Sequence, residues 1–225
     1  MASVNLRRED IETGLFEEMI QEGEKAGLFQ RLPVAAREKS RRDIIAQLPE
    51  GEDIWLFAYG SLIWSPMIDF SEKRLATLYG YHRRFCLSTK IGRGTPEKPG
   101  LVLGLENGGS CHGLAFRITA DDTERELKLI WNREMIGGSY TPKVVKLKTE
   151  DGTIQAITFV INRTHENYAG RLSTEAVAEI IATAAGPLGA CADYLFSTVE
   201  HMKELNLHDR HMFHLGEMVR ERMQK

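Results

Sequence analysis

The stretch Ile54-Trp55-Leu56-Phe57-Ala58-Tyr59-Gly60-Ser61-Leu62 combines an uninterrupted apolar run with an abrupt change to small residues. The run predicts a buried strand, and Gly60-Ser61 predicts a sharp turn directly after it. Such a turn can present consecutive backbone N–H groups that bind an anion, with the Ser61 hydroxyl beside them. Because an ordinary strand and turn has the same residue types, the stretch alone leaves both interpretations open and favours the ordinary turn.

Further strands are expected after this run, up to about residue 163. The candidates are residues 79–87, 100–106, 113–118, 143–148 and 154–161. Asp151-Gly152 predicts a hairpin between the last two. One helix interrupts the series: it begins near Thr119, which could form a cap with Asp122 three positions later, and runs through Trp131.

Helical periodicity occupies both ends of the chain. Residues 5 to about 48 predict helix, interrupted at Pro33, and residues 173–225 predict three helices, the first capped by Ser173. Strands in series together with clustered helices predict an α+β fold and not a doubly wound sheet. We divide the chain into a helical N-terminal extension, residues 1–50, and a main domain, residues 51–225, that includes the C-terminal helices.

The composition is that of an ordinary globular protein. The 225 residues are 42% hydrophobic and 27% charged with a net charge of −3, which gives no sign of nucleic-acid binding. No run approaches the roughly 18 apolar residues of a membrane span, and the N-terminus has no signal-like apolar segment. The cysteines Cys86, Cys111 and Cys191 are widely spaced and form no CxxC pair. We therefore expect a cytoplasmic protein without a nucleic-acid or membrane partner.

A single carboxylate stands out in Asn132-Arg133-Glu134-Met135-Ile136-Gly137-Gly138-Ser139-Tyr140. Glu134 follows the apolar residues Leu129-Ile130-Trp131 at the expected end of a helix, with glycines close behind. Burial against an apolar wall would raise the pKa of its carboxyl group toward the range of a general base. The alternative is a surface glutamate paired with Arg133, and the residues alone favour that alternative.

The segment Lys90-Ile91-Gly92-Arg93-Gly94-Thr95-Pro96-Glu97-Lys98-Pro99-Gly100 predicts a loop, because it is rich in glycine and proline. Arg93 could meet a substrate carboxylate through its planar guanidinium group. An ordinary hairpin connection is the simpler interpretation.

Two other patterns carry little weight. His208, His211 and His214 follow helical spacing, but their charged neighbours favour a solvated helix face over a metal site. Cys111-His112 are neighbours on a predicted strand, so their side chains should point to opposite faces and cannot form a dyad.

Four marks in this order resemble the ChaC family of glutathione-specific γ-glutamyl cyclotransferases, over about residues 54–219. Ala58 departs from the pattern, since a glycine is common there. The marks are residues 57–64; Arg83-Arg84-Phe85 with Arg93-Gly94 and Lys98-Pro99-Gly100; Arg133-Glu134 with Gly137-Gly138 and Tyr140; and residues 184–189 with Tyr194-Leu195-Phe196.

The resemblance implies a γ-glutamylcyclotransferase-like core, a mixed β-sheet or barrel with flanking helices. It implies cleavage of glutathione to 5-oxoproline and cysteinylglycine by attack of the α-amine on the γ-carbonyl, with Glu134 as general acid and base. No metal and no cofactor are implied, and no oligomeric state follows. The substrate-binding residues would be Leu56, Phe57, Ala58, Tyr59, Gly60, Ser61 and Leu62, with Arg93 and Tyr140 as weaker candidates.

Two alternatives remain open. The same chemistry could act on other γ-glutamyl amines or dipeptides, because specificity depends on the far end of the pocket. The chain could instead be a non-catalytic regulatory or binding protein linked to cation transport, although a binding module would have no use for a base at Glu134.

Overall fold

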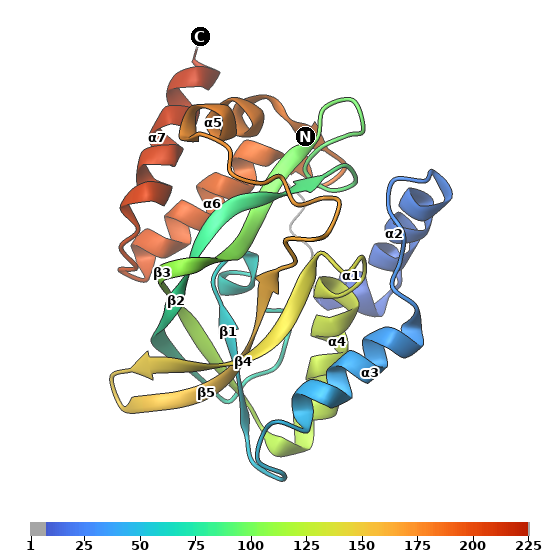
Figure 1. Cartoon of the computed structure of the whole chain (residues 1–225), viewed down its shortest axis with the longest axis vertical. Helices are drawn as coiled ribbons and strands as arrows, with labels where there is room; N and C mark the ends of the chain where they lie inside the picture. Colours follow the sequence, from blue (N-terminus) through green and yellow to red (C-terminus); the bar gives the residue numbers. More distant parts are fainter. Residues whose placement is uncertain (1–7, 225) are drawn as a thin grey trace. The chain divides into compact units, whose positions relative to one another are not determined.

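The computed structural model describes residues 8–224 (Figure 1). These residues divide into two compact units. Of these residues, unit 1 comprises 8–29, 84–103 and 166–224, and unit 2 comprises 30–83 and 104–165. Glu134 and the turn at Gly60-Ser61 both belong to unit 2, whereas Arg93 belongs to unit 1. The division of the chain at residue 50 stays a prediction.

Five strands close into a barrel in the order β1-β3-β2-β4-β5. Their bounds are β1 Ile54–Ala58, β2 Glu72–Thr89, β3 Gly100–Ile118, β4 Tyr140–Thr149 and β5 Gly152–Ile161. Antiparallel pairs join β1 to β3, β2 to β4 and β4 to β5, and a parallel contact of Leu56 with Ile157 joins β1 to β5. Helices flank this mixed barrel, so the predicted fold class is confirmed.

The strands are longer than predicted, and the predicted gap between residues 106 and 113 is wrong. That gap holds Gly108 and Gly109, whose φ angles are 102° and 71°. Glycine adopts such angles without steric cost, so β3 continues through the pair. The hairpin between β4 and β5 is confirmed, since Thr149 pairs with Gly152, whose φ is 121°.

Helix α4 (Thr123–Glu134) carries the candidate carboxylate at its last position. Leu127, Ile130 and Trp131 are buried at helical spacing, and the Trp131 ring lies 5.1 Å from the ring of Phe159 in β5. The helix begins later than predicted, after the 3₁₀ turn η2 (Ala120–Asp122). The Thr119 hydroxyl donates to the Asp122 carboxylate at 2.8 Å and caps no backbone group.

Helix α3 (Val34–Ile45) lies along α4 (Figure 1). Arg37 donates to the Asn132 side chain at 3.1 Å, and the Trp131 indole donates to the Ser40 hydroxyl at 3.3 Å. These contacts hold α4 against α3, while the Trp131 ring packs against Phe159 of the barrel. The C-terminal end of α4 is therefore fixed on two sides.

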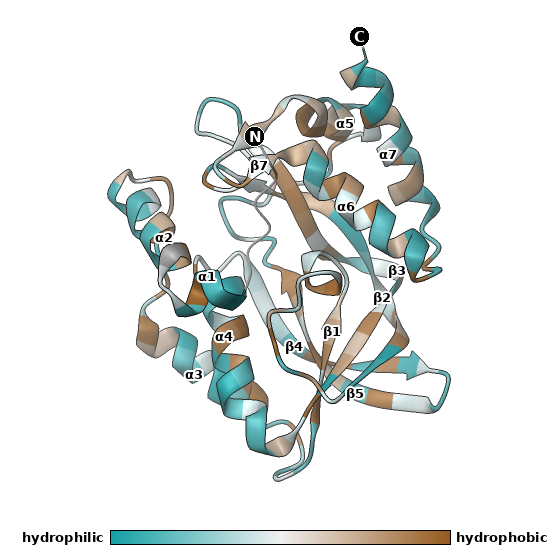
Figure 2. Cartoon of the chain, turned by 180° about the vertical axis from the view of Figure 1, so that it is seen from behind, coloured by the Kyte–Doolittle hydropathy of each residue, from teal (hydrophilic) through white to brown (hydrophobic). Residues whose placement is uncertain are grey.

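The remaining helices belong to unit 1. They are α1 Arg8–Glu12, α2 Leu15–Lys25, α5 Thr174–Thr183, α6 Cys191–Glu204 and α7 Arg210–Met223, with the short strands β6 Ala185–Gly186 and β7 Gly189–Ala190. Hydrophobic and hydrophilic residues alternate along α5, α6 and α7 (Figure 2), and their apolar faces pack together. The Ser173 cap is confirmed, because its hydroxyl accepts from the Ala176 N–H. The break at Pro33 is confirmed too, but it extends back to residue 26, and a second break at Thr13-Gly14 was not predicted. Residues 5–7 of the predicted helix lie outside the described residues.

Within residues 8–224, no helix combines the length and the apolar character that crossing a membrane would require.

We expect Leu127→Ala to lower the free energy of unfolding by about 2–5 kcal/mol, because it removes a fully buried side chain between α4 and its neighbours. The matched control is Lys128→Ala, the next residue on the same helix, which is exposed. Urea denaturation followed by circular dichroism measures both. An equal loss in the two variants would contradict the assigned core face of α4.

Candidate active site

The turn after β1 forms as predicted. The strand ends at Ala58, and Ser61–Ile63 form a 3₁₀ turn in which the Ile63 N–H donates to the Gly60 carbonyl at 2.9 Å. The Ser65 N–H donates to the Ser61 carbonyl at 2.9 Å and tightens the turn further. The first N–H groups of a helical turn have no partner within it, so they are available to an anion.

The last three residues of the strand that leads into this turn are fully buried. Leu56, Phe57 and Ala58 have 0% of their surface exposed, which makes them part of the barrel wall. Tyr59 is nearly buried as well, and its hydroxyl donates to the Phe159 carbonyl at 2.9 Å. Substrate binding by these four residues stays a prediction. The Tyr59 hydroxyl already has a partner, so Tyr59 would contact the substrate through its backbone.

Glu134 ends α4 and is largely buried, with 15% of its side chain exposed. Burial raises the pKa of its carboxyl group, and the positive charge of Arg133 opposes that rise. The predicted direction of the pKa shift is therefore confirmed. The prediction of an exposed surface pair is wrong in one respect: Arg133 and Glu134 do form an ion pair, but only 11% of the Arg133 side chain is exposed.

Arg133 connects this carboxylate to the turn. Its Nε lies 3.1 Å from a Glu134 carboxylate oxygen, and its Nη2 donates to the Ser61 hydroxyl at 2.6 Å. Its Nη1 donates to the Ser65 carbonyl at 3.0 Å. One guanidinium group therefore contacts both Glu134 and the turn, and the sequence analysis missed this bridge because nothing in the residue pattern links positions so far apart.

The loop that follows Glu134 is held by four hydrogen bonds to consecutive carbonyls, those of residues 136–139. Leu32 N–H donates to Ile136 at 2.8 Å, and Asn162 donates to Gly138 through its side chain at 3.1 Å and to Ser139 through its N–H at 2.9 Å. His165 Nε2 lies 2.9 Å from the Gly137 carbonyl, so that nitrogen carries a proton and donates it. Sequence analysis gave no sign of these supporting residues.

Tyr140 and Arg93 occupy different surroundings. Tyr140 is the first residue of β4 and pairs with Ile161, directly after the loop described above. Arg93 lies in unit 1, is 7% exposed and donates to the Ala190 carbonyl at 3.4 Å; burial lowers the pKa of its guanidinium group, and Asp193 opposes that effect. Substrate contacts by either residue stay predictions.

The structure also describes the residues of the two weaker patterns. Cys111 is buried while its neighbour His112 is exposed, so the two side chains lie on opposite faces of β3. Over the part of the chain that the structure describes, no three His, Cys, Asp or Glu residues come together as metal ligands, the row His208, His211 and His214 included.

Comparisons with known proteins relate this chain to one family. The family described as ChaC-like protein matches residues 54–222. A glutathione-specific gamma-glutamylcyclotransferase from Escherichia coli (strain K12) is 42% identical over 166 residues, which cover 73% of this chain and 72% of that protein. Gamma-glutamylcyclotransferase 2-1 from Arabidopsis thaliana is 34% identical, covering 76% of this chain and 83% of that protein.

The fold is also that of a solved structure. A yeast gamma-glutamyl cyclotransferase specific to glutathione superposes with a TM-score of 0.70, covering 76% of this chain and 96% of that one at 19% identity. The residues that match the family, 54–222, contain the turn at Gly60-Ser61, Arg133 and Glu134. On the family match and on these relatives, the chain belongs to the ChaC-like protein family.

Proposed function

We propose that this protein is a γ-glutamyl cyclotransferase that cleaves glutathione to 5-oxoproline and cysteinylglycine. The observation that carries the proposal is the shared guanidinium group of Arg133, which contacts the Glu134 carboxylate and the Ser61 hydroxyl at once. It supports the proposal because the reaction needs an acid–base group beside an anion-binding turn. The name of the relative from Escherichia coli points to the same substrate.

The reaction needs no enzyme nucleophile. The substrate's α-amine attacks its own γ-carbonyl, a new C–N bond closes the five-membered ring, and the amide bond to cysteine breaks. The α-ammonium nitrogen loses two protons as it becomes the ring amide, and the departing nitrogen gains two as it leaves as an ammonium group. A carboxylate between the two nitrogens can relay these protons from one to the other. Holding the γ-glutamyl chain in a folded conformation supplies the remaining acceleration.

The turn supplies a place for the α-carboxylate of the γ-glutamyl group. Ser61 Oγ accepts a hydrogen bond from Arg133, so its own hydroxyl proton is available to an anion. Together with the N–H groups at the start of the turn, this hydroxyl would bind the α-carboxylate next to Glu134. Binding there leaves the α-amine close to the carboxylate that must deprotonate it.

We also assign the protein to the cytoplasm. Cys86, Cys111 and Cys191 are all buried as thiols, which suits a reducing compartment. Burial raises the pKa of Cys191 to about 11, so this thiol stays protonated and unreactive at neutral pH.

We expect Glu134→Gln to lower kcat for 5-oxoproline formation from glutathione about 10²- to 10⁴-fold, because the amide keeps the shape but cannot accept a proton. The matched control is Glu150→Gln, an exposed acid in the β4–β5 turn of the same unit. Product chromatography with glutathione and γ-glutamyl-alanine as parallel substrates measures both variants. Near wild-type turnover by Glu134→Gln would exclude Glu134 as the base.

The pH dependence follows from the raised pKa of Glu134. Below that pKa the carboxyl group is protonated and cannot accept the ammonium proton, so kcat/KM should fall as the pH falls through it, at a pH above the ordinary glutamate pKa of about 4.3. Arg133→Met removes the charge that opposes the rise, so the acid limb should move to higher pH. Arg133→Lys keeps a positive charge and should move the limb less.

A kcat/KM profile from pH 4 to 9 at constant ionic strength measures this shift. The assignment fails if Arg133→Met moves the acid limb to lower pH or leaves it in place.

A further inference from the structure

A surface hollow of about 300 Å³ lies in unit 2, at the N-terminal end of β4 and the C-terminal end of β5. Its apolar lining comes from Leu105, Val160 and Ile161. Its polar lining consists of two cations and three neutral side chains: Lys143, Arg163, Asn107, Thr141 and Asn162. No acidic residue is part of the lining, so the hollow is suited to an anion.

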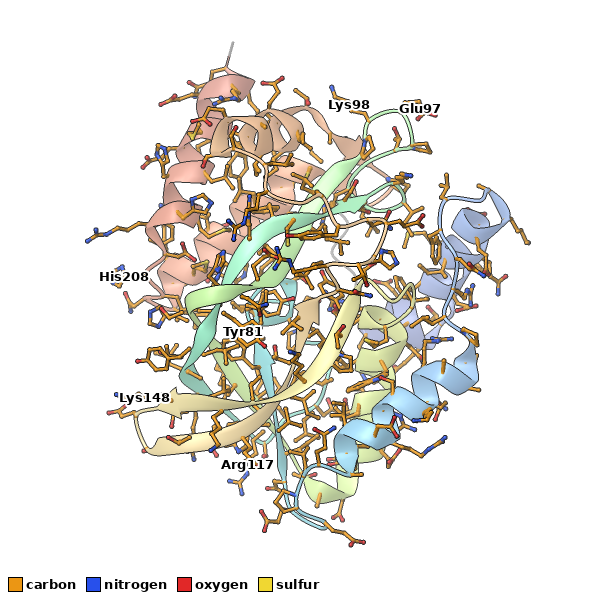
Figure 3. All side chains as sticks on the ribbon, viewed as in Figure 1. Tyr81, Glu97, Lys98, Arg117, Lys148 and His208 are labelled. Atoms are coloured by element: carbon orange, nitrogen blue, oxygen red, sulfur yellow. The ribbon has the colours of Figure 1, made fainter. Side chains whose placement is uncertain are left out.

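The charge of the hollow comes mainly from Lys143. Its ammonium group lies 3.2 Å from the Tyr81 hydroxyl and 5.8 Å from the centre of that ring, and it forms no ion pair with any described carboxylate. Figure 3 labels Tyr81, which belongs to β2. A neutral phenol leaves the positive charge uncompensated, whereas Arg163 faces the buried Glu106 carboxylate at 3.7 Å.

The hollow begins where the Glu134 loop ends. Thr141 directly follows Tyr140, and Asn162 binds the loop carbonyls of Gly138 and Ser139 at 3.1 and 2.9 Å. A short segment, residues 135–140, therefore runs from the proposed acid–base group to the edge of the hollow. Because β1 and β5 are parallel, the hollow at the C-terminal end of β5 lies at the same end of the barrel as the Gly60-Ser61 turn.

We propose that the hollow binds the C-terminal carboxylate of the peptide substrate, with Lys143 as the main cation. The inference rests on the proposed function and adds the part of the site that recognises the leaving half. One unpaired cation beside amide and hydroxyl groups suits one carboxylate, and hydrogen bonds between opposite charges are the stronger kind. Peptides with that carboxylate are thereby preferred over simple γ-glutamyl amines, which lack it.

The test compares glutathione with its glycine monoethyl ester, which lacks the carboxylate charge. Lys143→Met should raise KM for glutathione about tenfold, leave kcat unchanged and leave KM for the ester unchanged, because only binding of the charged end is lost. Lys148→Met is the matched control, since it removes the same charge from an exposed position on the same strand, labelled in Figure 3, outside the hollow. Circular dichroism confirms that both variants fold.

The proposal is overturned if Lys143→Met changes KM equally for glutathione and the ester, or changes neither. A small free carboxylate could occupy the same hollow in place of the substrate's carboxylate, and acetate is the probe for it. The assignment to the substrate is overturned if acetate binding depends on Lys143 while the wild-type enzyme has the same KM for glutathione and the ester. Wild-type enzyme that releases no 5-oxoproline would refute the proposed function separately. Calorimetric binding of glutathione and the ester to Glu134→Gln, with and without Lys143→Met, tests the hollow without turnover.

Discussion

The guanidinium group of Arg133 is the interaction on which the rest of the site depends. A buried cation is costly unless it is paired and hydrogen-bonded, and Arg133 meets both conditions through Glu134, the Ser61 hydroxyl and the Ser65 carbonyl. Because its planar fork contacts all three groups at once, it fixes the distance between the carboxylate and the turn. The same charge keeps the pKa of Glu134 from rising as far as burial alone would take it.

This arrangement has a cost in stability. Burial raises the pKa of Glu134, so the folded protein retains that proton to higher pH than the unfolded chain does. The free energy of unfolding therefore decreases as the pH rises from the ordinary glutamate pKa to the raised one. The buried residues Leu127, Ile130 and Trp131 on α4 offset this loss, because they anchor the helix to its neighbours at the end that carries Glu134.

Local sequence patterns predicted helices and strands, but they could not predict contacts between residues far apart in the sequence. The apolar run before Gly60 predicted β1 and its turn, and the Leu127–Trp131 periodicity predicted the helix that ends in Glu134, because both signals lie within a few neighbouring residues. The reach of Arg133 to Ser61 and the support of the Glu134 loop by Asn162 could not be predicted, since each joins segments that only the closed barrel brings together. The strand β3 was predicted as two pieces because glycine usually marks a turn and here continues a strand.

The parallel contact between β1 and β5 explains why the Gly60-Ser61 turn and the supports of the Glu134 loop lie at one end of the barrel. Parallel strands have their C-terminal ends at the same edge, so the Gly60-Ser61 turn after β1 and the Asn162 turn after β5 lie at one end. The hydrogen bond from Tyr59 to the Phe159 carbonyl joins the two strands at that edge. Since α4 also packs on β5 through Trp131 and Phe159, Glu134 lies at the same edge as the Gly60-Ser61 turn, and Arg133 contacts both. An antiparallel closure would place the two turns at opposite ends and separate the Gly60-Ser61 turn from the residues that hold the Glu134 loop.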